Sequence, residues 1–135
     1  MTTTIPQQSD LSITRSATQA DAQLIVSMVS TPMASHAFDG AGLLFSLDAP
    51  LSYEQFETDY PVGSDERRNI NALLGFNETL GTFCKRGLLD PGLVYDLYWI
   101  SGMWKACEGI ALGIRAKAGD ARMYENFEAL AAGDA

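Results

Sequence analysis

The chain has few of the residue types that build catalytic and metal sites. Its 135 residues include one histidine, His36, and two cysteines, Cys84 and Cys107, which stand far apart and match no metal-binding spacing. No serine or cysteine nucleophile motif accompanies His36, so a catalytic triad would have to be assembled entirely from distant residues. These shortages predict a non-catalytic protein that uses no metal and no other cofactor.

A long apolar run is missing as well. The most apolar stretch, 93–114, is interrupted by Asp96, Lys105 and Glu108, which predicts a core helix rather than a membrane span. Residues 1–11 are polar and lack both the basic start and the apolar stretch of a secretory signal. We therefore predict a cytoplasmic protein whose two cysteines are free, with a disulfide between facing helices as the alternative.

Positive charge is scarce, since nine Lys and Arg stand against seventeen Asp and Glu, for a net charge of -8. Such a surface repels nucleic acids and anionic membranes, so neither is predicted as a direct partner. The acids gather in an acidic segment that contains no base: Asp48, Glu54, Glu57, Asp59, Asp65 and Glu66. This segment is interpreted either as a solvated surface that keeps the protein soluble or as a docking patch for a basic protein partner.

What the chain does contain is the pattern of a helical globular domain. It is 47% hydrophobic and 19% charged, which is far from the composition of a disordered chain. Apolar residues recur at spacings of three and four, and no strand pattern of comparable strength occurs. We predict one all-α domain over 1–135, a compact antiparallel bundle of five to seven helices, with residues 1–13 flexible.

Capping residues mark the expected helix starts. They are Ser16 or Thr18, Thr31, Ser52, Ser64, Asp90 and Asp120. The two longest helices, 64–86 and 91–118, are expected at the centre of the bundle. Glycines are expected to interrupt two of the helices: Gly40 and Gly42 should kink or break the helix over 32–47, and Gly102 and Gly109 can divide the helix over 91–118.

Several polar and aromatic residues lie in or beside apolar helix faces. One interpretation is a structural network in which Arg115 pairs with Glu108 or Glu128 and holds the last helix. The other is a small pocket walled by Trp104 and Tyr124. The candidate residues are Asn77, Trp104, Glu108, Arg115, Tyr124 and Glu128. Trp99 falls outside the main apolar arc, so it is either packed by another helix or exposed as an interface anchor.

A set of motifs in about the last half of the chain carries a family resemblance. They are a leucine pair followed by an aromatic (Leu73, Leu74, Phe76), a turn with Gly87, Leu89 and Asp90, a helix from Trp104 to Arg115, and a closing Tyr124, Phe127 and Glu128. Over about residues 70–130 the chain is similar to a bacterial family of small helical domains of unknown function. The resemblance implies an all-helical fold and no particular chemistry. Members of that family often carry an N-terminal membrane anchor, whereas nothing before Gly40 is expected to span a bilayer here.

Three functions remain as hypotheses. The first, and the one predicted, is a non-catalytic protein-protein interaction module that acts through the acidic segment, with exposed aromatics as a further means of docking. The second is an acidic inhibitor of the phage or mobile-element type, which blocks a basic nucleic-acid-binding groove of a host protein. The third is a small-molecule-binding protein or enzyme that uses the region of Asn77, Glu108 and Arg115.

Overall fold

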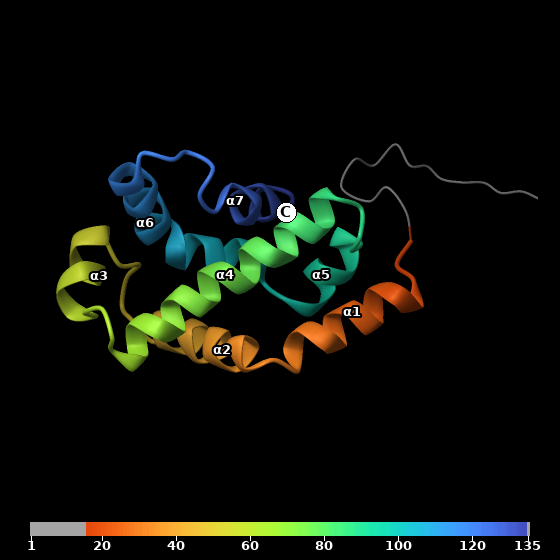
Figure 1. Ribbon diagram of the computed structural model, residues 1–135, viewed down its shortest axis with the longest axis horizontal. Coiled ribbons are helices and arrows are strands. Elements are labelled where there is room, and N and C mark those ends of the chain that lie inside the picture. The colour runs from red at the N-terminus through yellow and green to blue at the C-terminus, as the bar shows by residue number, and fades with distance from the viewer. Residues whose placement is uncertain (1–15, 135) are drawn as a thin grey trace, which may run out of the picture.

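A computed structural model describes residues 16–134, and this part of the chain forms seven α-helices and no strand (Figure 1). The helices are α1 (Gln19–Val29), α2 (Pro32–Phe45), α3 (Tyr53–Asp59), α4 (Asp65–Lys85), α5 (Pro91–Leu97), α6 (Ile100–Ala118) and α7 (Glu125–Ala132). The predicted all-α fold is confirmed, at the upper end of the expected number of helices. The prediction that residues 1–13 are flexible lies outside the described residues.

Five helices begin where the sequence predicts. In each, the side-chain oxygen of the capping residue accepts a hydrogen bond from the backbone N–H three residues later, which satisfies a donor that the helix itself leaves open. The caps are Thr18, Thr31, Ser52, Ser64 and Asp90. Thr18 and Ser52 form full capping boxes with Asp21 and Gln55.

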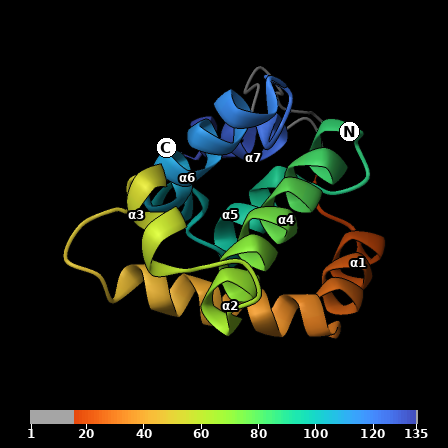
Figure 2. The ribbon, with the colours of Figure 1, turned by 60° about the vertical axis from the view of Figure 1, so that its left-hand side comes forward.

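Helix α4 occupies the centre of the fold, between α2 and α7 (Figures 1 and 2). It packs most extensively against α2 and next against α7. Since α2 leads toward α3 and α4 leads away from it, α2 and α4 run in opposite directions. The apolar face of α4 is buried through Ile70, Leu73, Leu74, Phe76 and Leu80.

Two glycines allow backbone to approach backbone on the two sides of α4. A Cβ atom at Gly40 of α2 would lie 2.3 Å from the carbonyl oxygen of Asn69, and one at Gly81 of α4 would lie 2.2 Å from that of Asn126. Helix α2 continues through Gly40 and Gly42, so a break there, one of the two predicted outcomes, is wrong. Contact with α4 supports α2 along its length, and the absent side chain of Gly40 is what permits this contact.

The predicted helix over 91–118 does divide, but at Tyr98 and Trp99 rather than at Gly102 or Gly109. Tyr98 adopts an extended conformation between α5 and α6. The Trp99 ring then folds back over Gly102, where a Cβ would lie 2.2 Å from the ring. Gly109 is approached in the same way by the carbonyl oxygen of Leu51, at 2.6 Å from its built Cβ. Both glycines therefore serve close packing.

The start of the last helix also differs from the prediction. Asp120 accepts a hydrogen bond from the backbone N–H of Arg122 at 2.9 Å and so caps a turn, whereas α7 begins only at Glu125. The residue before it, Tyr124, has a left-handed backbone (φ 60°) and makes no side-chain cap. In place of a local cap, Glu78 of α4 accepts hydrogen bonds from the first turn of α7.

Two further features concern the membrane and thiol predictions. Among the helices of residues 16–134, none is long and apolar enough to cross a membrane. Cys84, which is partly buried, and Cys107, which is buried, form no disulfide in this structure.

Candidate functional site

Arg115 of α6 forms a network that holds the end of the chain. Its Nε donates to the carbonyl oxygen of Met123 at 2.7 Å, and its Nη2 lies 2.7 Å from Oε1 of Glu128. The guanidinium also lies 5.9 Å from the ring centroid of Trp104, whose ring in turn meets Phe127 edge-on at 5.0 Å. Because the arginine side chain is only 16% exposed and these partners occupy it, the network fixes the turn after α6 and the helix α7.

Three pocket candidates remain. Tyr124 directly follows Met123, which Arg115 binds, whereas Asn77 and Glu108 lie outside this network. Burial raises the pKa of Tyr124, and the nearby Glu78 carboxylate raises it further. Asn77 is fully buried in α4, where its Nδ2 donates to the carbonyl oxygen of Leu73 at 3.0 Å. Glu108 is exposed on α6. Of the two partners considered for Arg115, the structure contains the pair with Glu128.

No hydrogen bond or ion pair joins Asn77 or Glu108 to Arg115 within residues 16–134. The structure therefore joins Arg115, Trp104 and Glu128 in one network and leaves Asn77 and Glu108 outside it. The same described part of the chain contains no group of three His, Cys, Asp or Glu side chains that could hold a metal ion.

The acidic segment is less uniform than its sequence. Glu57 accepts a hydrogen bond from the Tyr53 hydroxyl at 2.5 Å, and it pairs with Arg67 at 3.4 Å and with Lys117 at 3.9 Å. The hydrogen bond from Tyr53, followed by that from Arg67, lowers the pKa of Glu57. The Arg67 guanidinium also lies 4.2 Å from the centroid of the Phe56 ring, so Glu57 helps to attach α3 to α4 and α6.

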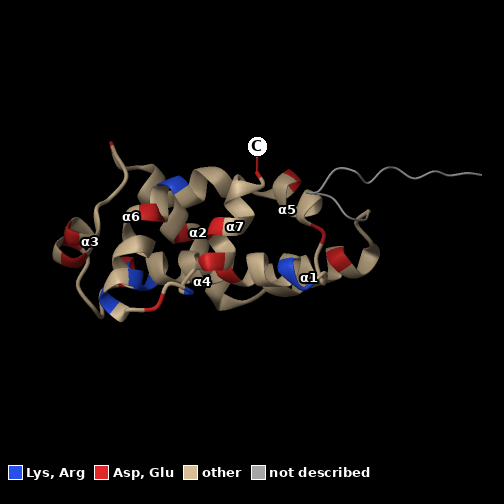
Figure 3. Cartoon of the chain, turned by 90° about the horizontal axis from the view of Figure 1, so that it is seen from above, with Lys and Arg blue, Asp and Glu red and all other residues tan. Residues whose placement is uncertain are grey.

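The other five carboxylates of this segment are exposed: Asp48, Glu54, Asp59, Asp65 and Glu66. Asp65 pairs with Arg68 at 3.2 Å. Figure 3 shows basic residues among the acidic ones at the end of the molecule that carries α3. The exposed charge at this end is therefore mixed, with an acidic excess.

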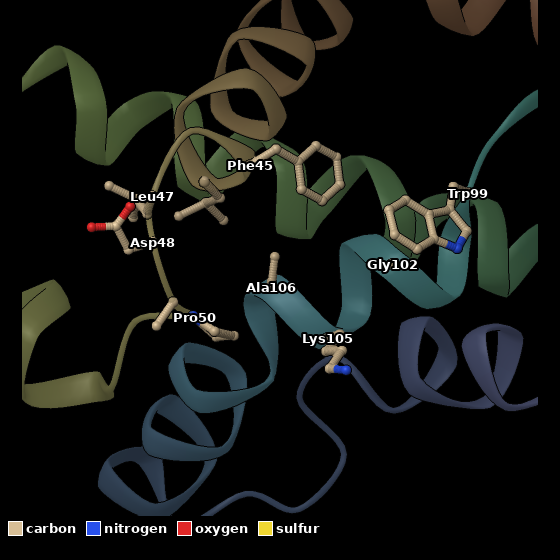
Figure 4. Close-up of a pocket in the computed structure, with 10 residues that line it drawn as sticks. Phe45, Leu47, Asp48, Pro50, Trp99, Gly102, Lys105 and Ala106 are labelled. Carbon is tan, nitrogen blue, oxygen red and sulfur yellow. The ribbon is translucent and has the colours of Figure 1, made fainter.

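A groove around Trp99 is the other notable surface. Trp99 is 67% exposed and stacks on Phe45, which is 48% exposed, with ring centroids 5.9 Å apart. The two rings border a hollow of about 190 Å³ between the end of α2, the connection to α3 and the first turns of α6. We call this the Trp99–Phe45 groove and define it by Phe45, Leu47, Asp48, Trp99, Lys105 and Ala106 (Figure 4).

The chemistry of the groove is mainly apolar with two charges at its edge. Figure 4 shows Ala106 at its floor, with Asp48 and Lys105 on opposite sides of that floor. Both charged side chains are exposed. The rest of the lining is mainly apolar, and this surface suits the binding of an apolar side chain.

The aromatic surface continues beyond the groove. Phe38, two turns before Phe45 on α2, stacks on Tyr98 at 6.1 Å, and both rings contact the buried Phe76. The first turn of α6 is held by Asp134, whose carboxylate accepts a hydrogen bond from the Ser101 N–H at 2.9 Å. These contacts fix the backbone that presents Trp99.

Part of this site could be seen in the sequence. Trp99 stands outside the apolar arc, and Phe38 and Phe45, seven residues apart, were a further signal that sequence reasoning did not use. The position of Lys105 opposite Asp48 has no local signal, because the two residues come together only through the packing of α2 against α6.

Comparison with known proteins adds a family and no function. No curated protein and no solved structure matches this chain. One family model, described as a domain of unknown function (DUF4760), matches residues 15–133. This range covers every described helix, and the chain therefore belongs to the DUF4760 family.

Proposed function

We propose that the chain is a non-catalytic protein-binding module that docks through the Trp99–Phe45 groove. The observation that carries the proposal is a tryptophan that remains 67% exposed although its position is fixed by stacking on Phe45. Tryptophan is enriched among the residues that dominate binding energy in protein interfaces. A rigid, exposed aromatic pair binds with little loss of side-chain entropy.

The apolar area that Trp99 and Phe45 expose is enough for the anchor of an interface but not for a complete interface. A buried aromatic side chain covers about 150–250 Å², so Trp99 and Phe45 together leave roughly 250 Å² exposed. At about 25 cal/mol per Å², covering that area contributes about 6 kcal/mol before the loss of translational freedom is subtracted. A standard interface covers about 800 Å² per partner, so neighbouring side chains must contribute the remaining contacts.

The acidic segment is the second candidate surface. Its exposed carboxylates Glu54, Asp59 and Glu66 support docking to a basic protein, including the inhibitor type that occupies a nucleic-acid-binding groove. Asp48 belongs to both surfaces. Replacing Glu54, Asp59 and Glu66 together with lysine should abolish binding to such a partner without changing the circular dichroism spectrum; unchanged binding would remove this candidate.

We also propose a cellular location and a class of partner for the protein. The absence of a disulfide between Cys84 and Cys107 supports a reducing cytoplasm. The net charge of -8 supports a protein partner over nucleic acid or an anionic membrane. The bacterial origin and the membrane anchors that the resemblance implied for the family are also kept as proposals. The small-molecule hypothesis receives less support, since Asn77 is sealed and Glu108 faces outward.

Capture from lysate of the source organism tests the groove. The tagged chain and its Trp99→Ala variant are compared, with Leu88→Ala as control, because Leu88 is 58% exposed on a turn outside the groove. We expect Trp99→Ala to lose a specific partner by at least about tenfold. Leu88→Ala should retain it. Equal capture by both variants would contradict docking through Trp99.

A further inference from the structure

We propose that the Trp99–Phe45 groove binds a second copy of the same chain and so forms a two-fold symmetric dimer. This inference rests on the proposed function, because it names the occupant of the same groove. Its basis is the pattern of charge around the apolar floor. Asp48 and Lys105, both exposed, stand on opposite sides of Ala106 (Figure 4).

Such a pattern is complementary to itself. In a two-fold interface, the contact between residue i of one copy and residue j of the other is repeated with the roles exchanged. If two grooves face each other across an axis between Asp48 and Lys105, each Asp48 meets the Lys105 of the other copy. One symmetric arrangement therefore forms two opposite-charge pairs and covers the aromatic rings of both copies.

The same charges disfavour simpler occupants. A uniformly basic segment would meet Lys105, and a uniformly acidic one would meet Asp48. The occupant that satisfies both carries an acid and a base on either side of an apolar surface, as this chain does. Although a net charge of -8 opposes self-association, the two charges at the groove cancel, and physiological salt screens more distant charges beyond about 8 Å.

The available apolar surface predicts a moderate affinity. Two further apolar side chains are exposed: Phe38, which stacks on Tyr98, is 42% exposed, and Leu97, two residues before Trp99 in the chain, is 51% exposed. Together with Trp99 and Phe45, these two expose roughly 400 Å² per copy, about half of what a standard interface covers. We therefore expect a dimer that dissociates on dilution rather than an obligate one.

Light scattering of the full chain over the micromolar range, combined with charge exchange, tests the proposal. The wild-type mass should rise with concentration from one chain of 14.6 kDa to two. Asp48→Lys and Lys105→Asp should each remain monomeric, since each places like charges opposite each other twice. An equimolar mixture of these two variants should form dimers again, as should the double variant D48K/K105D. Circular dichroism confirms the fold of every variant.

Three results would contradict the proposed dimer. The first is a wild-type chain that stays monomeric at the highest concentration. If it nevertheless captures another protein through Trp99, the proposed function stands and only the identity of the occupant is wrong. A dimer that both single variants retain uses another surface. Loss of the dimer in both single variants without recovery in the mixture and in the double variant contradicts the pairing of Asp48 with Lys105.

Discussion

Replacing Glu78 with alanine is expected to destabilise the fold by about 3 kcal/mol. Its carboxylate in α4 accepts hydrogen bonds from the backbone N–H groups of Asn126 and Phe127, at 3.0 Å and 2.9 Å, and from Nδ2 of Asn126 at 2.9 Å. Helix α7 has no side-chain cap from its own N-cap residue, Tyr124. Glu78 is therefore the cap of a helix that begins 47 residues later in the chain.

The magnitude follows from these contacts. Removing a helix cap costs about 0.5–2 kcal/mol, and a hydrogen bond to a charged group contributes about 1.5–3 kcal/mol. The bonds of one carboxylate are not additive, and the side chain is only partly buried, so we expect about 3 kcal/mol rather than the sum. Glu78→Gln retains one acceptor oxygen but loses the charge at the helix N-terminus, which predicts a loss of about 1.5 kcal/mol.

Urea unfolding followed by circular dichroism measures both values. Glu108→Ala is the matched control, because this glutamate is exposed in the middle of α6 and should change stability by less than about 0.5 kcal/mol. Hydrogen exchange adds a local test: the amides of Asn126 and Phe127 should lose protection before those of α4. A Glu78→Ala protein as stable as the control would refute the capping argument, and so would a glutamine variant as unstable as the alanine variant.

Three other perturbations have expected outcomes. Gly40→Ala should lower the melting temperature, because its Cβ would lie 2.3 Å from a backbone oxygen and would force α2 away from α4. Gly42→Ala meets open space and should stabilise the helix by about 0.5–1 kcal/mol. A Gly40→Ala protein that is more stable than the Gly42→Ala protein would contradict the packing role of Gly40. Folding lowers the pKa of Glu57, so its carboxylate stabilises the fold above its unfolded pKa of about 4.3, and this stabilisation disappears as the pH falls through the lower folded value. Glu57→Gln should consequently lose less stability than the wild type between about pH 5 and pH 3 in urea titrations, and an equal loss would show that the folded pKa is not lowered. Burial raises the pKa of Cys107 to about 12. A thiol reagent at about pH 8 should therefore leave Cys107 unmodified in the folded protein and modify it in denaturant, and the Cys84→Ser variant, in which Cys107 is the remaining cysteine, should behave in the same way. Rapid reaction of Cys107 in the folded state would contradict its burial.

The helix starts could be predicted because each cap depends on a few neighbouring residues. Thr18, Ser52 and Ser64 bond backbone groups three positions away, and such a signal is complete within the local sequence. The same locality explains the error at Asp120. Its side chain makes the expected kind of bond, but to a turn, while the cap of α7 comes from Glu78 across the core.

Glycine was misjudged for a related physical reason. Helix propensity assigns Gly40, Gly102 and Gly109 a loss of stability, and from sequence alone this predicts breaks. In the folded chain each of these glycines lies against a backbone oxygen or an aromatic ring at a distance that excludes a Cβ. The identity of that neighbour depends on the packing of distant segments, which no local pattern contains.

Arg115 and Trp99 both depart from the apolar pattern of their helix, and what separates a structural role from a functional one is whether the folded chain itself supplies the partners of the side chain. Arg115 was an outlier in the sequence, and the folded chain supplies it with Met123, Glu128 and Trp104. Trp99 was an outlier too, yet the chain supplies only the Phe45 ring and the backbone at Gly102 and leaves two-thirds of the Trp99 surface in water. Keeping that surface exposed is unfavourable for an isolated monomer, so a partner that covers it gains free energy which the fold alone does not recover. This difference is why the proposed function is assigned to the groove and not to the arginine network.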